Sequence, residues 1–428
     1  MQATEECLGR IQADNGRLNA FILVMADEAR RQAKAADAEL AAGHDRGPLH
    51  GVPISLKDLL DVRGVATTAA SRVREGHVAE HDCPVVTHLR QAGAVFLGKT
   101  NLHEFAFGTT NEDSAYGPAR NPYDPNRSPG GSSGGSAASV AAGMALATIG
   151  TDTGGSIRIP SAACGLVGLK PTFGEVSVDG VVPLSTTLDH VGPLARSVTD
   201  AWLVYRALLG GSPAKPPAPA PVNGLRLAVL RSYFCDLLDD EVRARFEESV
   251  AAMARAGARI DEVDIRHAPD IGTVYLHICL PDAAAYHAAT LEAMPEKYTT
   301  NVRLRLEMGR YILAEDYARA LAGRDVLRRE VDAALAQHDA LLTPTLPIPA
   351  PLIGANSVSI AGKDEPVRNV MLRLTQPFNV SGHPAITMPC GTTAAGLPCG
   401  MQLVGARNET DALVRVALTV EEALTRAH

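Results

Sequence analysis

Two clusters of glycine and serine lie close together in the first half of the chain, and their residue types are suited to acyl chemistry. The first occupies residues 130–136 (GGSSGGS) and the second residues 154–156 (GGS). Glycine lets the backbone approach a ligand or adopt a positive φ, and successive backbone N–H groups at a turn can bind an anion. A serine among such donors could be a nucleophile beside an oxyanion hole. One cluster alone would indicate only a flexible loop, but two so close together favour acyl transfer.

The stretch between the clusters has small or apolar side chains throughout. Residues 137–149 read AASVAAGMALATI. A helix that is apolar on every face is a buried helix, and this stretch is shorter than the ~20 residues that cross a membrane. We therefore expect one central buried helix over residues 137–149, with a serine cluster at each end.

A lysine lies in a second apolar stretch, residues 51–60 (GVPISLKDLL). A surface strand with Lys57 paired to Asp58 is one interpretation. The apolar residues in this stretch leave no consistently polar face, however, which favours a buried strand that carries Lys57 into the interior.

Two short motifs suggest other chemistries. Residues 93–100 (GAVFLGKT) match the Walker A pattern, but a P-loop needs a flexible turn between strand and helix. Here the intervening residues are apolar and predict a strand, so we expect no nucleotide site. Residues 130–134 match GxSxG, the nucleophile elbow of α/β-hydrolases. That interpretation gives the second cluster no role, but it stays open because several histidines downstream could be the base: His190, His267, His277, His287, His338 and His383.

Composition limits the remaining functions. The chain has 428 residues, 46% of them hydrophobic, which is enough to bury a large core. The formal net charge is −8 without a block of Lys or Arg, so we expect no nucleic-acid partner. No apolar segment near the N-terminus or elsewhere predicts a signal peptide or a membrane span. The seven cysteines form no CxxC pair and the histidines no HExxH motif, which favours a cytoplasmic protein without a metal.

Strand-like and helix-like segments alternate along the chain, and this predicts an α/β fold with helices on both faces of a sheet. A Pro-rich connector covers residues 210–221 (GGSPAKPPAPAP). We expect strands at residues 94–97, 225–230, 385–389 and 401–404, and helices at 84–92, 199–209, 239–256, 410–427 and over most of 282–336.

The sequence around the serine clusters resembles that of the amidase signature enzymes. GGSSGGSAA followed by GTDTGGSIRIPSAACGLVGLKPT is similar to the family signature, and further blocks occur in the family's order from about residue 50 to 405: HGVPISLKDLLDVRG, GKTNLHEFAFGTTNE, NPYDPNRSPGGSSGG, VVPLSTTLDHVGPLARSV, LLTPTLPIPAP, PFNVSGHPAITMPCG and GLPCGMQLVG. The resemblance implies the amidase signature fold, a mixed central β-sheet covered by helices on both faces. It also implies one domain over residues 1–428, with its core at 45–210 and 340–428 and a variable, mostly helical part at 211–340.

The resemblance further implies a catalytic triad of Lys57, Ser132 and Ser156. Ser156 falls on the nucleophile, Ser132 on a bridging serine whose peptide bond is cis in the family, and Lys57 on the base. The oxyanion hole would be the backbone N–H groups of Thr153, Gly154, Gly155 and Ser156. A lysine is a base only when it is neutral, and the apolar neighbours of Lys57 would lower its pKa as this role requires.

Substrate contacts are implied for residues close to these motifs. Asp152 and Arg158 flank the expected nucleophile, and a local ion pair between them is an alternative to substrate binding. An apolar lining suits hydrophobic acyl or aryl groups, although the same side chains could be core packing. The residues implied as contacts are Gly131, Phe107, Gly108, Thr109 and Asp152, and further pocket candidates are Phe105, Tyr286, Met294, Met308 and Tyr311.

The implied activity is hydrolysis of amides, and also of esters and carbamates, through an acyl-enzyme without a cofactor. We expect a small-molecule substrate and a monomer or homodimer. An alternative within the family is the glutaminase subunit of a tRNA-dependent amidotransferase, which works with a partner chain. That subunit uses an aspartate before a PxN segment to hold glutamine, whereas residues 370–376 (VMLRLTQ) before Pro377 contain no acid.

Overall fold

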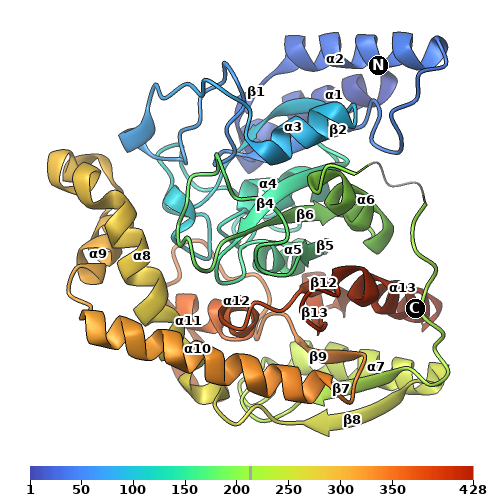
Figure 1. Cartoon of the computed structure of the whole chain (residues 1–428), viewed down its shortest axis with the longest axis vertical. Coiled ribbons are helices and arrows are strands. Elements are labelled where there is room, and N and C mark those ends of the chain that lie inside the picture. The colour runs from blue at the N-terminus through green and yellow to red at the C-terminus, as the bar shows by residue number, and fades with distance from the viewer. Residues whose placement is uncertain (212–214, 428) are drawn as a thin grey trace.

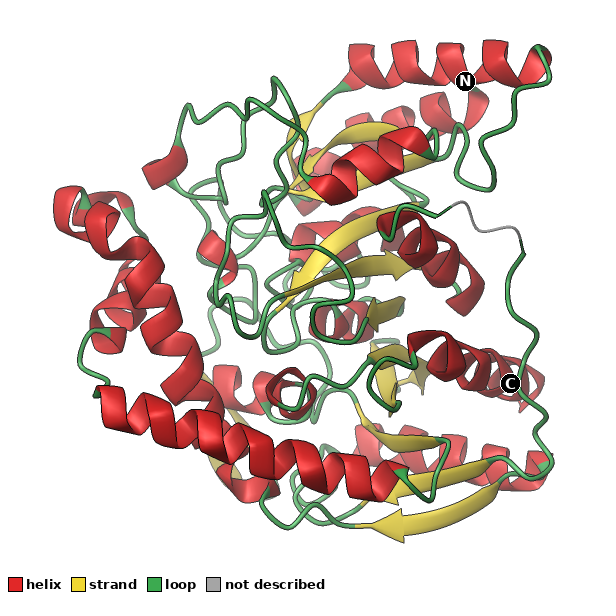
Figure 2. Ribbon diagram, in the orientation of Figure 1, coloured by secondary structure: helices red, strands yellow, loops and turns green. Residues whose placement is uncertain are grey.

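The computed structural model describes residues 1–211 and 215–427. These residues form a mixed eleven-stranded sheet in the order β1-β3-β2-β4-β6-β5-β12-β13-β9-β7-β8, with helices around it (Figures 1 and 2). Both parallel and antiparallel neighbours occur in this sheet. A separate two-stranded hairpin is formed by β10 and β11. The expected mixed α/β architecture is therefore confirmed.

The strands are β1 (Phe21–Val24), β2 (Pro53–Lys57), β3 (Val95–Thr100), β4 (Ala147–Asp152), β5 (Val167–Lys170), β6 (His190–Ala195), β7 (Arg226–Leu230), β8 (Arg259–Val263), β9 (Ala340–Pro344), β10 (Ser357–Ile360), β11 (Lys363–Pro366), β12 (Ala385–Thr392) and β13 (Pro398–Val404). The helices are α1 (Gln2–Leu18), α2 (Ala26–Ala41), α3 (Pro84–Gln91), α4 (Gly134–Ala141), α5 (Arg158–Ala163), α6 (Val198–Leu208), α7 (Asp240–Ala256), α8 (Ile271–Ala293), α9 (Thr300–Gly309), α10 (Ala314–Leu335), α11 (Val367–Leu372), α12 (Gln376–Val380) and α13 (Thr410–Ala427). Short 3₁₀ turns lie at Arg72–Arg74, Glu104–Ala106, Ala268–Asp270 and Pro295–Lys297.

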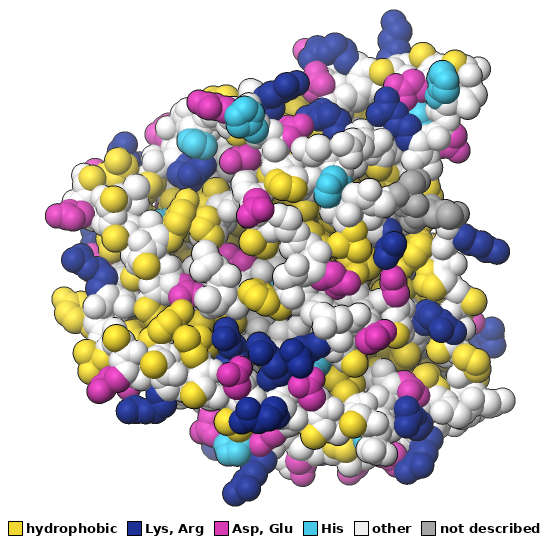
Figure 3. All heavy atoms as spheres, viewed as in Figure 1, with side chains coloured by type: hydrophobic (Ala, Val, Ile, Leu, Met, Phe, Trp, Pro, Cys, Tyr) yellow, Lys and Arg dark blue, Asp and Glu magenta, His cyan; other side chains and the backbone are white. Residues whose placement is uncertain are grey.

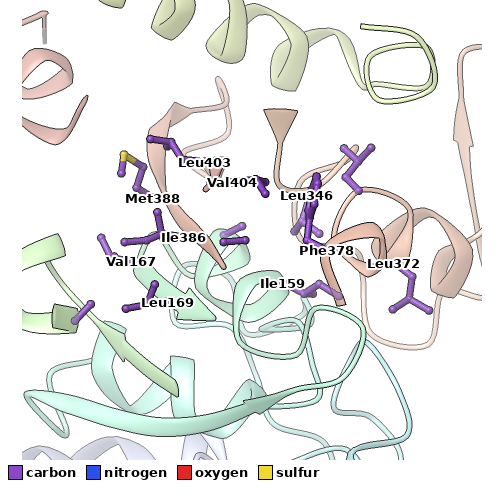
Figure 4. Packing of buried hydrophobic residues seen from close by; sticks show 14 of the residues in the cluster. Ile159, Val167, Leu169, Leu346, Leu372, Phe378, Ile386, Met388, Leu403 and Val404 are labelled. Carbon is purple, nitrogen blue, oxygen red and sulfur yellow. The ribbon is translucent and has the colours of Figure 1, made fainter. Parts of the chain in front are cut away.

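Helices pack along the sheet in two groups. One group contains α3, α6, α13 and α7, each in contact with the next, and the other contains α1, α4 and α5. Helix α8 packs on both α9 and α10 at one end of the molecule (Figure 1). The apolar side chains of β5, β12 and β13 pack together beside Ile159 of α5 and Phe378 of α12 (Figure 4). Burial of these faces from water supplies the main driving force for folding.

The central part of the sheet positions the expected catalytic residues. β2 is parallel to both β3 and β4, and Leu56 lies opposite Ile149. The carboxyl ends of β2 and β4 therefore meet at the same edge of the sheet, where Lys57 ends one strand and Asp152 ends the other. Ligands of open α/β sheets bind beyond such strand ends.

The prediction of one helix over residues 137–149 is wrong. Helix α4 spans only Gly134–Ala141, and the second half of the run forms strand β4. Gly143 lies between them with φ +69°, a left-handed conformation that turns the chain. A short apolar run does not distinguish a buried helix from a buried strand by its periodicity. Because α4 leads away from the first serine cluster and β4 leads back to the second, the two clusters meet instead of lying at opposite ends of a helix.

The other predicted elements correspond to observed ones. The expected strand near residues 225–230 is β7, and the expected helix at 239–256 is α7. The helical stretch 282–336 is divided between α8, α9 and α10. The connector at residues 210–221 lies partly outside the described residues, because 212–214 are not among them.

Exposed apolar side chains gather over the end of the molecule built by α8 and α9 (Figure 3). Tyr311 is 83% exposed and Met308 52%. Within the described residues, no helix combines the length and apolar character that crossing a bilayer requires.

Candidate active site

Lys57, the last residue of β2, is completely buried and points its amino group at two hydroxyls. Its Nζ donates to Ser132 Oγ at 2.8 Å and to Thr151 Oγ1 at 2.7 Å. Neither partner carries a charge. The lysine is therefore solvated by hydroxyl groups only, in contrast to Lys99, whose amino group lies 2.8 Å from the Asp58 carboxylate.

Burial determines the protonation of Lys57. Loss of hydration lowers its pKa from 10.5 to about 7, and the negative charges of Asp152 and Asp189 oppose this effect only in part. A substantial fraction of the Lys57 amine is thus neutral near pH 7. A neutral amine has a lone pair and can accept a proton from a neighbouring hydroxyl.

The two serine clusters lie against each other at this point. The peptide bond between Gly131 and Ser132 is cis, as the resemblance implies for the bridging serine. The backbone N–H of Ser133 donates to the carbonyl oxygen of Ser156 at 3.3 Å, so Ser132 and Ser156 belong to adjoining backbone segments. Ser156 is 6% exposed, and its Oγ makes no hydrogen bond to any residue that the structure describes.

The backbone between β4 and α5 forms a turn with free donors. The N–H groups of residues 153–156 donate to no acceptor in the described part of the chain. Gly155 has φ +140°, and a Cβ atom there would stand 2.2 Å from Thr375 Oγ1, so only glycine fits. Thr375 in turn donates from Oγ1 to the carbonyl oxygen of Gly154 at 2.6 Å. Thr375 therefore holds the turn from its carbonyl side and leaves its N–H groups available for an anion.

The Asp152 carboxylate stabilises the turn through hydrogen bonds. Its carboxylate accepts two hydrogen bonds from the Arg158 guanidinium, each at 3.1 Å, and further bonds from Ile157 N at 3.2 Å and Asn379 Nδ2 at 2.8 Å. Arg158 also donates to Gln402 Oε1 at 3.0 Å. Burial would raise the pKa of Asp152, but the charge and hydrogen bonds of Arg158 outweigh it and hold that pKa well below its usual range. This geometry favours the ion-pair alternative for Asp152, because both carboxylate oxygens are occupied and the residue is fully buried.

Asp189 is a further acid close to the site, and no motif in the sequence gave it a role. Its carboxylate accepts from Thr153 Oγ1 at 2.5 Å and from the backbone N–H groups of Leu184 and Ser185 at 2.9 and 3.1 Å. Burial raises its pKa to about 6, although these hydrogen bonds oppose the shift. Thr151 and Thr375 were likewise missed, since a threonine has no distinctive spacing. Alternation along β4 is the signal that could have found Thr151: it faces Lys57 because Asp152 faces the opposite way.

The implied substrate-contact residues lie together around Gly131. A Cβ atom at Gly131 would stand 2.9 Å from the carbonyl carbon of Thr109, so the two segments touch. A Cβ atom at Gly108 would overlap the His103 ring at 2.1 Å. Phe107 is 1% exposed, and its carbonyl oxygen accepts from Arg305 Nη1 at 2.6 Å. The structure therefore brings Gly131 against Thr109, which directly follows Gly108 in the chain, whereas the Phe107 ring is buried in the core.

The further pocket candidates are Phe105 and four residues of the variable region. Phe105 packs edge-on against the His287 ring, with centroids 4.3 Å apart, which is core packing. Tyr286, Met308 and Tyr311 belong to the exposed apolar end formed by α8 and α9, and Met294 follows the C-terminal end of α8.

The competing motifs find no support in the geometry. The residues that match Walker A run into strand β3, and Lys99 is engaged by Asp58. In the described residues, no histidine ring is hydrogen-bonded to a serine of either cluster. Residues 77–81 (HVAEH) place two histidines and a glutamate at a spacing known from zinc enzymes. These three side chains are exposed in a loop, however, and the described residues contain no group of three or more potential ligands able to hold a metal ion.

Comparison with known proteins agrees with this arrangement of the sheet. The family model described as Amidase matches residues 2–414, and the chain belongs to this family. It is 40% identical over 439 residues to an amidase from Pseudomonas putida, with 99% of this chain and 92% of that protein covered. It is 39% identical over 452 residues to a glutamyl-tRNA(Gln) amidotransferase subunit from Koribacter versatilis (strain Ellin345), with 97% and 93% covered.

A solved structure entitled "Crystal structure of amidase" superimposes with a TM-score of 0.92 at 38% identity and covers 98% of this chain and 95% of that one. The fold is therefore the amidase signature fold, and the protein is an amidase-family hydrolase of carbon–nitrogen bonds.

Proposed function

We propose that the protein hydrolyses amides through an acyl-enzyme on Ser156, with Ser132 as proton relay and Lys57 as base. The observation that carries this proposal is the contact of the buried Lys57 amine with Ser132 Oγ at 2.8 Å, beside a turn with free N–H groups. Membership of the amidase family supports the same assignment.

The first step of the reaction forms a tetrahedral intermediate. Ser156 Oγ attacks the substrate carbonyl carbon while its proton passes to Ser132 Oγ, and the Ser132 proton passes to neutral Lys57. The carbonyl oxygen becomes an oxyanion, which the N–H groups of Thr153, Gly154, Gly155 and Ser156 stabilise. Preorganised donors of this kind typically contribute about 3–4 kcal/mol each to the transition state.

Collapse of this intermediate forms the acyl-enzyme. Protonated Lys57 gives its proton through Ser132 to the leaving nitrogen, and the carbon–nitrogen bond breaks. A water molecule then attacks the acyl group by the same route in reverse and releases the acid. An ester would lose an alcohol in place of an amine, and an aryl carbamate would pass through a carbamoyl-enzyme, so we include both as substrates.

An amidotransferase subunit is the second candidate, favoured by the similarity to the Koribacter versatilis protein. The sequence before Pro377 argues for a simple amidase. The segment before Pro377 offers no carboxylate to hold the amino group of glutamine.

Hydrolysis of a substrate panel by wild type and Ser156→Ala tests the proposal. The panel contains a nitroanilide, an aryl carbamate, a nitrophenyl ester, a linear aliphatic amide and glutamine. We expect Ser156→Ala to lose about 10³-fold or more on the amide, while Ser139→Ala in α4 retains activity as the matched control. Full activity in Ser156→Ala would overturn the mechanism. Activity on glutamine alone, and only with a partner chain, would favour the amidotransferase.

We also propose that residues 1–428 form one domain. β7 and β8 come from the variable part, yet they continue the sheet through β9, which pairs with β13 of the core. Limited proteolysis should then give no stable fragment that consists of residues 211–340 alone.

A further inference from the structure

A largely enclosed cavity of about 250 Å³ lies next to the expected catalytic residues and has no role in the mechanism above. It lies between the end of β4 and the loop of residues 178–184 that follows β5. Most of its walls are apolar, and they include Leu59, Val182 and Val191. The inner end, in contrast, is polar.

Two threonines join the inner end of the cavity to the catalytic residues. Thr151 lines the cavity, and its Oγ1 accepts the hydrogen bond from Lys57 at 2.7 Å. Thr153 also lines it and is followed directly by Gly154 and Gly155 of the turn that ends in Ser156. The cavity therefore borders the hydroxyl that holds Lys57 and the first residue of the turn that ends in Ser156.

A single carboxylate, that of Asp189, stands at this inner end. An ionised carboxylate has about four lone-pair sites, and Asp189 uses three of them for Thr153, Leu184 and Ser185. Asp189 remains partly accessible and lines the cavity. One acceptor site is thus left for a donor that enters the cavity. Asp179, at the exposed outer end, is the other acid in its wall.

An apolar pocket with one carboxylate at its inner end matches a molecule with an apolar body and one ammonium group. Amide hydrolysis makes such a molecule when the nitrogen carries an alkyl group. We propose that this cavity is the leaving-group subsite, which takes the alkyl group of an N-alkyl amide and holds the product ammonium at Asp189. This assignment rests on the proposed function, and it names a substrate class: amides of small apolar primary amines.

The chemistry balances without another reactant. The Ser156 proton travels through Ser132 and Lys57 to the amide nitrogen, and the carbon–nitrogen bond breaks to give a neutral primary amine. Water then hydrolyses the acyl-enzyme to a carboxylic acid, whose proton is taken up by the amine. The sum is amide plus water to carboxylate plus alkylammonium, and the alkylammonium is the species that a carboxylate binds.

The volume of the cavity sets the size of the amine. At the ~30 Å³ that a water molecule occupies in the liquid, 250 Å³ holds about eight non-hydrogen atoms. A butyl or hexyl chain with its nitrogen fits this space. Each methylene transferred from water into the cavity should strengthen binding about fourfold.

Calorimetric titration of the Ser156→Ala protein with simple amines tests the subsite without turnover. The probes are methylammonium, n-butylammonium and n-butanol, the last as a neutral control of the same length. We expect n-butylammonium to bind about 50-fold more tightly than methylammonium, because three more methylenes are buried. Equal binding of the two amines would overturn the proposal.

Variants locate the bound molecule. Asp189→Asn in the same background should weaken n-butylammonium about tenfold or more, the usual loss for a hydrogen bond to a charged group, and leave n-butanol unchanged. Asp179→Asn should leave both unchanged. If Asp179→Asn abolishes the binding and Asp189→Asn does not, the ammonium is at the outer end and the assignment is wrong.

A cavity-filling variant keeps the proposal testable even if Asp189→Asn fails to fold. Val178→Phe, at the partly exposed end, should weaken both n-butylammonium and n-butanol. In the otherwise wild-type enzyme it should lower the rate on an N-butyl amide relative to the primary amide about tenfold or more. An unchanged ratio would contradict the subsite. If Ser156→Ala keeps its hydrolytic activity, the proposed function fails, whatever the amines do. If that activity is lost but the amines bind the cavity variants as tightly as they bind Ser156→Ala, only the subsite assignment is wrong.

Discussion

The pH dependence of the reaction follows from the burial of Lys57. In the proposed mechanism the base is the neutral amine, so activity is present above the pKa of Lys57 and is lost as the pH falls through it. With a pKa of about 7, about half of the enzyme carries a neutral Lys57 at pH 7 and about 1% at pH 5. A lysine with its ordinary pKa would be neutral in only about 0.03% of molecules at pH 7.

The assay is kcat/KM against pH with an uncharged nitroanilide, because kcat/KM reports the free enzyme. We expect a fall of about 50-fold from pH 7 to pH 5 and a rise of no more than about twofold from pH 7 to pH 9. A profile that is flat between pH 5 and pH 8 would refute the assignment of Lys57 as base. So would one that still rises steeply above pH 9, since it would mean that burial does not lower the pKa.

Asp189 supplies a check on the cause of the profile. Its negative charge raises the pKa of Lys57, so Asp189→Asn should move the midpoint to lower pH. The carboxylate itself has a pKa of about 6, and the two groups therefore titrate together in the wild type. A histidine base would give a similar midpoint, but it would keep its activity in Lys57→Met, whereas the proposed mechanism predicts that this variant is inactive.

Three further outcomes are expected. Lys57→Met should raise the free energy of unfolding at pH 7 by on the order of 4 kcal/mol. The reason is that the folded state depresses the pKa of Lys57, so the wild type loses stability at pH values below the unfolded pKa of 10.5. In urea titrations the gain should shrink as the pH approaches 10.5, and a pH-independent difference would contradict this origin. Arg158→Met should lower the free energy of unfolding by about 3–5 kcal/mol, since it leaves the Asp152 carboxylate buried and without its charge partner; a loss below about 1 kcal/mol in urea would mean that the pair is not as buried as described. Gly155→Ala should lower kcat about 100-fold or more, because the new Cβ atom collides with Thr375 and displaces the N–H donors; near-normal kcat would exclude this turn as the oxyanion hole.

Local sequence patterns predicted the outline of the fold but not the path of the chain between the serine clusters. The run of residues 137–149 is apolar enough for either a buried helix or a buried strand, and only packing decides between them. The sheet selects the strand for Ala147–Asp152, because β2 and β6 flank it on both sides. No short-range signal contains that information.

The contacts within the site also divide into those that the sequence predicted and those that it did not. Lys57, Ser132 and Ser156 could be singled out because the sequence resembles that of the amidase signature enzymes, whereas the partner of Lys57 on β4 and the acid at Asp189 could not. For Asp152 the sequence left two roles open, a substrate contact and a local ion pair with Arg158. Side chains alternate along a strand, so Thr151 faces Lys57 while Asp152 faces Arg158. Position in the sequence alone could not choose between the two roles, because it does not give the face to which a residue belongs.

The order of strands explains how a lysine and two serines so far apart in sequence come together, as the proposed mechanism requires. β2 and β4 are parallel neighbours, so Lys57 and the turn after Asp152 emerge at the same edge of the sheet. Helix α4 begins beside this turn, and its start places Ser132 next to both. The same edge receives the loop that carries Asp189 through the antiparallel strand β6, which pairs Asp152 with His190. The proposed base, the proposed relay, the turn with free N–H groups and the Asp189 carboxylate therefore meet without any long excursion of the chain, and the cavity beside Asp189 is a direct consequence of the same strand order.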